Sequence, residues 1–296
     1  MINNHAVNRV LLKYAGKAKY LVPPKELFDK LKDETFIFFD TETTGLYPKV
    51  VQVTELAAVA VKGKDFTEID KIHRKIRLSE KTKARAMCEV KVREQLTARG
   101  EKLFGIDECL KMQGYNPEDP ELQEEKQALE DFYSFCEKHS AILVAQNAPF
   151  DLSMINSKLS QKVHNRGVLD TKLFMQFYII PALQALKAKG DTKATEVLGL
   201  ITRKDKIHST LGDILKAFGM DIKGWHGAFA DVQSTLEAFK NIVKYFDEHP
   251  EIHKEDVYKQ EQAKAFSKER GHIKKEKEKK KEFYKGDKKL YKVKEP

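Results

Sequence analysis

An apolar run that ends in two carboxylates constrains this chain of 296 residues more than any other feature. Residues 36–45 read FIFFDTETTG, and the uniformly apolar start is typical of a strand covered on both faces. Asp40 and Glu42 lie two positions apart, so their side chains leave the same face of that strand. Buried charges are usually paired or bound to metal, and carboxylate oxygens suit Mg²⁺ or Mn²⁺. The pattern therefore predicts a buried strand that carries part of a divalent-metal site.

The rest of the chain predicts a mixed sheet flanked by helices. Apolar runs bounded by turn residues predict further strands at 50–61, 66–78, 141–146 and 167–170. Helical spacing of apolar residues predicts helices within 80–139, from about Phe150, at 211–220 and at 228–246. Residues 186–208 are polar and predict no clear element, so an insertion is one interpretation. The order β-β-β-α-β-α-β-α favours an α/β fold with a mixed sheet.

The composition predicts a globular chain in a reducing compartment. The apolar fraction of 41% is enough for a sizeable core. The sequence contains no run of 18 apolar residues, the length that a membrane-spanning helix needs, so we expect no membrane span. The first residues lack the apolar stretch of a secretory signal, which favours a cytoplasmic location. Cys88, Cys109 and Cys136 are widely spaced and form no CxxC pair, so we expect reduced thiols and no zinc site.

The net charge of +9 is concentrated at the C-terminal end. Residues 268–296 hold 13 Lys and Arg against 6 Asp and Glu. A segment with so much charge predicts a solvated tail. The alternatives are contact with nucleic acid, with Phe283, Tyr284 and Tyr291 stacking on bases, or attachment to a polymerase.

Two other stretches combine an acid with an unusual context. Asn147-Ala148-Pro149-Phe150-Asp151 follows a predicted buried strand and places its acid in the first turn of a helix. The second stretch, His226-Gly227-Ala228-Phe229-Ala230-Asp231, opens the helix predicted at 228–246. Each acid alone fits a helix N-terminal residue that is favoured by capping and by the helix dipole, and His226 alone fits a surface loop.

Together, DTETTG, NAPFD and HGAFAD resemble the three motifs of the DEDD superfamily of 3′→5′ exonucleases, in its DEDDh branch. This branch includes the epsilon proofreading subunit of DNA polymerase III, ribonuclease T and oligoribonuclease. The resemblance covers roughly residues 34–246, with Gln146 at a position where the family often has His. It implies a ribonuclease-H-like fold with a mixed five-stranded sheet flanked by helices. We expect an exonuclease domain at 34–247, between an N-terminal extension, 1–33, and a charged tail, 248–296.

The resemblance also implies the site residues. Four converging carboxylates would repel one another, so they make sense only with two divalent cations between them. By the resemblance, two Mg²⁺ or Mn²⁺ ions would be held by Asp40, Glu42, Asp151 and Asp231. His226 would be the general base that activates water. The terminal nucleotide would be clamped by Thr43, Leu46 and Phe150.

By the resemblance, we expect a metal-dependent 3′→5′ exonuclease that releases nucleoside 5′-monophosphates, acting on single-stranded DNA in proofreading, repair or degradation. The expected partners are single-stranded 3′ ends, with DNA favoured over RNA, and a DNA polymerase or other replication protein, without a membrane. The same site cuts either sugar, so an exoribonuclease is the alternative within the class. A catalytically silent nucleic-acid-binding accessory of a polymerase is the alternative from another class.

Overall fold

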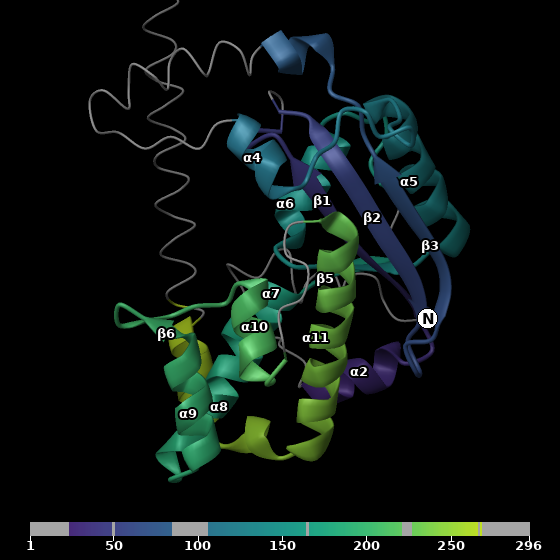
Figure 1. The fold of residues 1–296 in the computed structure, drawn as a ribbon. Coiled ribbons are helices and arrows are strands. Elements are labelled where there is room, and N and C mark those ends of the chain that lie inside the picture. Colours follow the sequence, from purple (N-terminus) through teal and green to yellow (C-terminus); the bar gives the residue numbers. More distant parts are fainter. Residues whose placement is uncertain are drawn as a thin grey trace, which may run out of the picture.

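The computed structural model describes residues 24–48, 51–84, 106–163, 166–220, 227–265 and 267. Within them, a five-stranded mixed sheet forms the centre of the fold, with strand order β3-β2-β1-β4-β5 (Figure 1). Strand β1 pairs antiparallel with β2 and parallel with β4, while β3 and β5 form the edges. The strands are β1 (Thr35–Thr43), β2 (Val53–Lys62), β3 (Glu68–Lys75), β4 (Ile142–Ala145) and β5 (Gly167–Asp170). The predicted mixed five-stranded sheet flanked by helices is confirmed.

Strand β1 is apolar along its length because helices cover both faces of the sheet. Phe36 and Phe38 point into one core, which they share with residues of α2 (Pro24–Leu31) and α11 (Ala228–Glu248). Ile37 and Phe39 point into the opposite core, which they share with residues of α5 (Glu125–His139) and α6 (Ala148–Asn156). The alternation places every second residue of β1 on the α11 side and the others on the α5 and α6 side.

The segment that carried no clear prediction, 186–208, contains regular structure. A long helical run crosses the C-terminal half of the fold and is followed by a two-stranded hairpin. The Arg203 side chain of this hairpin reaches both carboxylate oxygens of Asp213, at 2.6 and 3.0 Å, and so fastens the hairpin to the next helix. The elements are α7 (Thr171–Phe174), the π-helical η3 (Met175–Ile179), α8 (Ile180–Ala188), α9 (Thr192–Ile201), β6 (Thr202–Arg203), β7 (Lys206–Ile207) and α10 (Leu211–Ala217).

The connection between β3 and α5 is only partly helical in the described residues. Helix is present at 80–84 and in α4 (Ile106–Met112), and residues 113–124 contain none. The rest of this predicted helical region, residues 85–105, lies outside the described residues and includes Cys88. Of the other two cysteines, Cys109 is partly buried and Cys136 is buried.

The folded part of the chain extends past the predicted domain boundary at 247. Ile252, in the short helix η4 (Ile252–Lys254), and Tyr258, in a helix at 256–265, are 4% and 2% exposed and belong to the core of α11. Gln262, in the helix at 256–265, donates a hydrogen bond to the Phe177 carbonyl of η3. No helix in the described part of the chain combines the length and the apolar character needed to cross a membrane.

Candidate active site

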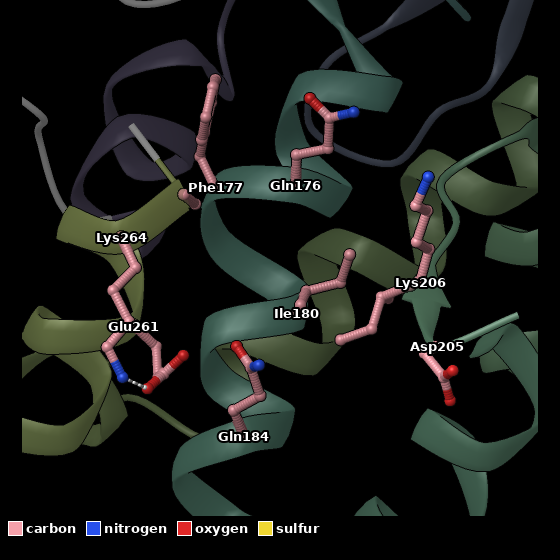
Figure 2. Close-up of a pocket in the computed structure, with 10 residues that line it drawn as sticks. Gln176, Phe177, Ile180, Gln184, Asp205, Lys206, Glu261 and Lys264 are labelled. Atoms are coloured by element: carbon pink, nitrogen blue, oxygen red, sulfur yellow. Dashed lines mark hydrogen bonds and ion pairs between the residues drawn. The ribbon is translucent and has the colours of Figure 1, made fainter. Parts of the chain in front are cut away.

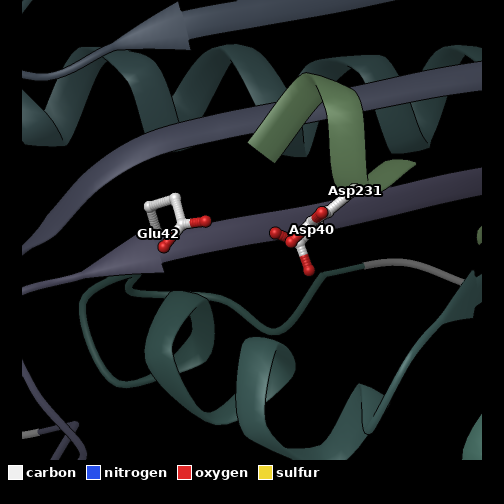
Figure 3. A group of neighbouring side chains, drawn as sticks. All are labelled: Asp40, Glu42 and Asp231. Carbon is white, nitrogen blue, oxygen red and sulfur yellow. The ribbon is translucent and has the colours of Figure 1, made fainter. Parts of the chain in front are cut away.

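Three carboxylates meet at the C-terminal end of β1 (Figure 3). One carboxylate oxygen from each of Asp40, Glu42 and Asp231 lies within 4.8 Å of the others. Asp40 and Glu42 leave β1 on the face covered by α11, and Asp231 sits in the first turn of α11. A helix N-terminus favours an acid there because the free N–H groups carry partial positive charge. Three carboxylates at this spacing could hold a divalent cation.

Asp151 approaches from the opposite face of the sheet. It is 2% exposed and lies in the first turn of α6, which follows β4. The Thr41 backbone N–H and hydroxyl donate to Asp151 Oδ1 at 3.1 and 2.6 Å. Thr41 lies between Asp40 and Glu42 but points to the α6 side, because successive strand residues alternate. The residue between the two acids therefore orients the third predicted metal ligand.

The turn that carries Asp151 is fixed by the end of β5. Asn147 adopts a left-handed conformation, with φ of 65°, and its N–H donates to Asp170 Oδ1 at 3.0 Å. The same oxygen accepts the Lys172 N–H at 2.9 Å and so caps α7. Gln146, at the position where the family often has His, donates to the Ser209 carbonyl at 2.9 Å. Burial raises the pKa of Asp170 to about 6, against the opposing effect of these N–H donors.

A fifth acid, Glu55, borders the site and was missed in the sequence. It stands opposite Glu42 in the antiparallel pairing of β1 and β2. Its Oε1 lies 2.6 Å from His73 Nε2, and the His73 ring stacks on Phe229 at the start of α11. The only signal in the sequence was an acid within the otherwise apolar run VVQVTELAAVAV. The pairing of β1 with β2 places Glu55 beside the carboxylate cluster of Asp40, Glu42 and Asp231.

Burial and mutual repulsion raise the pKa values of Asp40, Glu42 and Asp151. Burial raises the pKa of Glu42 to about 7, and the negative charges of Asp231 and Glu55 add to this shift. Burial also raises the pKa of Asp151 to about 7, although the hydrogen bonds from Thr41 lower it. The pKa of Asp40 is raised well above its usual range, first by burial and then by the charge of Asp151. A group of acids that resists ionisation is stabilised in its charged form by bound cations.

This repulsion predicts an unusual dependence of stability on pH when metal is removed. Unfolded carboxyls titrate near pH 4, whereas Glu42 and Asp151 have pKa values of about 7 in the folded chain. The folded state therefore binds more protons between about pH 4 and 7, so stability rises as the pH falls. We expect the melting temperature in EDTA to rise from pH 8 to pH 6.

The control for that measurement is Asp40→Asn, which removes one charge from the cluster. In EDTA at pH 8 the variant should melt at a higher temperature than the unmodified chain and should depend less on pH. Mg²⁺ should stabilise the unmodified chain at pH 8 and have a smaller effect on the variant. If the melting temperatures of the two proteins depended equally on pH, the carboxylate cluster would not be the source of that dependence.

The contact between Thr41 and Asp151 predicts a second effect. Thr41→Val keeps the shape of the side chain and removes the hydroxyl that donates to Asp151 at 2.6 Å. Partners that orient a metal ligand are typically worth about 10- to 100-fold in metal affinity. We expect a loss of Mn²⁺ affinity in that range by titration calorimetry, with Thr41→Ser restoring it. A Thr41→Val protein that binds Mn²⁺ as tightly as the unmodified chain contradicts this role.

The remaining predicted residues are placed as follows. Thr43 ends β1; its hydroxyl donates to the Gly45 carbonyl and its own carbonyl accepts from Gln113 Nε2 at 2.8 Å. Leu46 is 74% exposed in the loop after β1. Phe150 is partly buried in α6 against the core of the α5 side. His226 lies outside the described residues.

A cavity with a volume of about 410 Å³ shares no lining residue with the carboxylate cluster (Figure 2). It lies between η3 and α8, the β6–β7 hairpin and the helix at 256–265. Lys206 and Asp205 reach it from the hairpin, and Lys264 pairs with Glu261 on its other side. Its lining balances two lysines with two acids, so it does not select for one sign of charge.

Comparison with known proteins connects this site to nucleases. Residues 37–99 match the family described as "Exonuclease". The chain is 28% identical over 218 residues to "DNA polymerase III PolC-type" of Halalkalibacterium halodurans, which covers 72% of this chain and 12% of that protein. It is 30% identical over 196 residues to "DNA polymerase III subunit epsilon-like protein" of Rhodobacter capsulatus, covering 62% of this chain and 22% of that protein. The chain thus spans less than a quarter of the length of either relative.

Among solved structures, E. coli exonuclease I in complex with a dT13 oligonucleotide has the same fold over 76% of this chain and 45% of its own. The TM-score is 0.50 and the sequence identity is 15%, so this likeness concerns the fold alone. The resemblance to exonucleases, inferred above from three motifs, is confirmed by the family match to residues 37–99, a range that holds the first motif.

Proposed function

We propose that this protein is a metal-dependent 3′→5′ exonuclease that releases nucleoside 5′-monophosphates, with single-stranded DNA as its substrate. One observation carries the proposal: Asp40, Glu42 and Asp231, from two of the three motifs, present carboxylate oxygens within 4.8 Å of one another. They do so in a chain that matches the exonuclease family. The names of its relatives, DNA polymerases III, favour DNA over RNA and a replication partner such as a polymerase.

The donor set fits two divalent cations. All the candidate ligands are carboxylate oxygens, which Mg²⁺ and Mn²⁺ prefer. Burial and the neighbouring acids raise the pKa values of Asp40, Glu42 and Asp151, and a bound cation would oppose that shift. In the proposal, two Mg²⁺ or Mn²⁺ ions are held by Asp40, Glu42, Asp151 and Asp231. When bound, such ions lower the pKa of water and stabilise charge on the transferred phosphate.

The protein residues have separate tasks. Thr41 holds Asp151 in one orientation through its hydroxyl and N–H. His226 accepts the proton of the attacking water, a role that suits the histidine side chain in general. Thr43, Leu46 and Phe150 hold the terminal nucleotide, so that the last phosphodiester lies against the carboxylate cluster.

The test is product analysis on matched DNA and RNA oligonucleotides. With a 5′ label, a 3′→5′ exonuclease gives a ladder that shortens from the 3′ end, and with a 3′ label it gives a mononucleotide at once. Chromatography should identify nucleoside 5′-monophosphates. Faster degradation of RNA than of DNA would favour the exoribonuclease, and no degradation of either with Mg²⁺ or Mn²⁺ would favour the silent binding module.

A further inference from the structure

His73, on the edge strand β3, joins three elements beside the carboxylate cluster. Its Nε2 atom lies 2.6 Å from Oε1 of Glu55 in β2, and its ring stacks on Phe229 of α11 with the ring centroids 5.4 Å apart. In the strand pairing, Asp40 stands opposite Ala57, and Ala57 stands opposite His73. Side chains of paired residues leave a sheet on the same face, here the face covered by α11. Only the small side chain of Ala57 therefore stands between Asp40 and His73 across the sheet.

His73 also orients the carboxylate of Glu55. Lys75 stands opposite Glu55 in the pairing of β2 with β3, but its Nζ donates to Asp119 Oδ2 at 2.6 Å. The Glu55 side chain is only 15% exposed, and its carboxylate is directed toward the start of α11. A Cβ at Gly227 would meet Glu55 Oε2 at 3.8 Å, which is ordinary contact. Glu55 therefore lies between His73 and the residue that precedes α11.

The first turn of α11 has no side-chain cap among the described residues. Gly227 is its N-cap residue, and the turn is closed by a hydrogen bond from the Asp231 N–H to the Gly227 carbonyl at 3.0 Å. Helices are more often fixed at this end by the side chain of Ser, Thr, Asp or Asn. Here Gly227 lies against Glu55, and Phe229 lies against His73. The histidine and its acid therefore support the turn that carries Asp231.

A second group of the same three residue types lies on the opposite face of the sheet. His139 Nε2 lies 2.8 Å from Oδ2 of Asp70 in β3, and the centroids of the His139 and Phe135 rings are 4.8 Å apart. His139 ends α5, and Phe135 belongs to the core of the α5 side. This group joins β3 to α5 and contains no residue of α11 or of the carboxylate cluster. It provides a matched control for His73.

We infer that His73 is a positioning residue for the metal site: through Glu55 and Phe229 it fixes the first turn of α11. The turn in turn sets the position of Asp231 relative to the two acids of β1. This inference rests on the metal site of the proposed function and adds a residue that acts through its neighbours. Mg²⁺ requires near-octahedral geometry, whereas Ca²⁺ accepts about six to eight oxygens in a flexible arrangement. A turn that loses its support should therefore weaken Mg²⁺ binding more than Ca²⁺ binding.

The experiment measures the Mg²⁺ and Ca²⁺ affinities of the unmodified chain and three variants by titration calorimetry. His73→Leu removes both contacts of a side chain that is 37% exposed, so the core stays intact. We expect its Kd for Mg²⁺ to rise about tenfold, the lower end of the effect of partners that orient metal ligands. Its Kd for Ca²⁺ should change by less than about threefold. His73→Gln should recover part of the Mg²⁺ affinity, because its amide nitrogen can donate to Glu55, and His139→Leu should leave both affinities unchanged.

Turnover gives a second measurement. On a single-stranded DNA oligonucleotide, His73→Leu should have a lower kcat than the unmodified chain at limiting Mg²⁺ and should approach it at high Mg²⁺. KM for the oligonucleotide should be unchanged, because His73 acts on the metal site and not on the strand. A raised KM at saturating Mg²⁺ would contradict this role.

The outcomes separate this inference from the function on which it rests. If the unmodified chain binds Mg²⁺ but degrades no oligonucleotide, the proposed function fails, and the affinities still decide the role of His73. If the unmodified chain binds neither cation, both fail. Unchanged Mg²⁺ affinity in His73→Leu overturns the inference alone, and so do equal losses for Mg²⁺ and Ca²⁺, because altered charge would then be the cause.

A second variant covers the case in which His73→Leu does not fold, as judged by its melting curve in EDTA. Phe229→Leu removes the ring contact at α11 and leaves the contact between His73 and Glu55 in place. We expect the same preferential loss of Mg²⁺ affinity. A Phe229→Leu protein that binds Mg²⁺ as tightly as the unmodified chain would overturn the inference.

Discussion

Asp40→Asn is expected to reduce the turnover of single-stranded DNA by about a thousandfold or more. The substitution keeps the shape of the side chain and removes a charge from the point where β1 and α11 bring three carboxylates within 4.8 Å. Metal-ion catalysis contributes several kcal/mol of transition-state stabilisation, and each 1.36 kcal/mol is a factor of ten in rate. The measurement is kcat on a labelled oligonucleotide at saturating Mg²⁺, together with Mn²⁺ binding by calorimetry.

The matched control is Glu68→Gln, another acid-to-amide change on the same sheet. Glu68 opens the edge strand β3 and pairs with Lys71 at 3.2 Å, with 47% of its side chain exposed. Its substitution should leave kcat within about twofold, since exposed ion pairs of this kind contribute little. Unfolding curves in EDTA show whether both variants fold. An Asp40→Asn protein that folds and keeps more than a tenth of the turnover would contradict the role of Asp40 as a metal ligand.

The second large effect is expected for His226→Gln. General-base catalysis is typically worth about 10²- to 10⁴-fold, so kcat should fall in that range. Glutamine can still accept a hydrogen bond but cannot take the proton of the attacking water. Because His226 is not a proposed ligand, Mn²⁺ affinity should stay within about twofold of the unmodified chain. Loss of turnover and of metal binding together would assign His226 to the metal site and not to proton transfer.

The pH–rate profile distinguishes a base from a residue that only positions the substrate. At saturating metal, kcat of the unmodified chain should rise with pH through the titration range of a histidine, near 6.5. The His226→Gln profile should lose this rise. His253→Gln serves as control, because α11 runs about 25 Å from Asp231 to its C-terminal end at 1.5 Å per residue, and His253 lies in η4 beyond that end. A His226→Gln protein with an unchanged pH profile would rule out the general-base role.

The local sequence pattern was sufficient to predict those strands and helices whose buried residues recur at a regular spacing. The run FIFFD could be predicted as a central strand because helices cover both faces, and the structure places its odd and even residues in two separate cores. The 228–246 periodicity likewise predicted α11, whose buried side packs on β1 and β2. By contrast, α9 and the hairpin of β6 and β7 were not predicted. Their places depend on contacts with the rest of the fold: Ala194, Leu198 and Ile201 of α9 lie in the core shared with α11, and Arg203 of the hairpin pairs with Asp213.

The sequence by itself determined the mixed sheet, the three acidic motifs and the chemistry that carboxylate ligands favour. These follow from strand alternation, helix periodicity and the preference of divalent cations for oxygen. The tertiary structure decided how the motifs meet. Asp231 reaches Asp40 and Glu42 across one face of the sheet, whereas Asp151 comes from the other face and is held by Thr41. Glu55 also belongs to that arrangement, because strand pairing joins residues far apart in the chain.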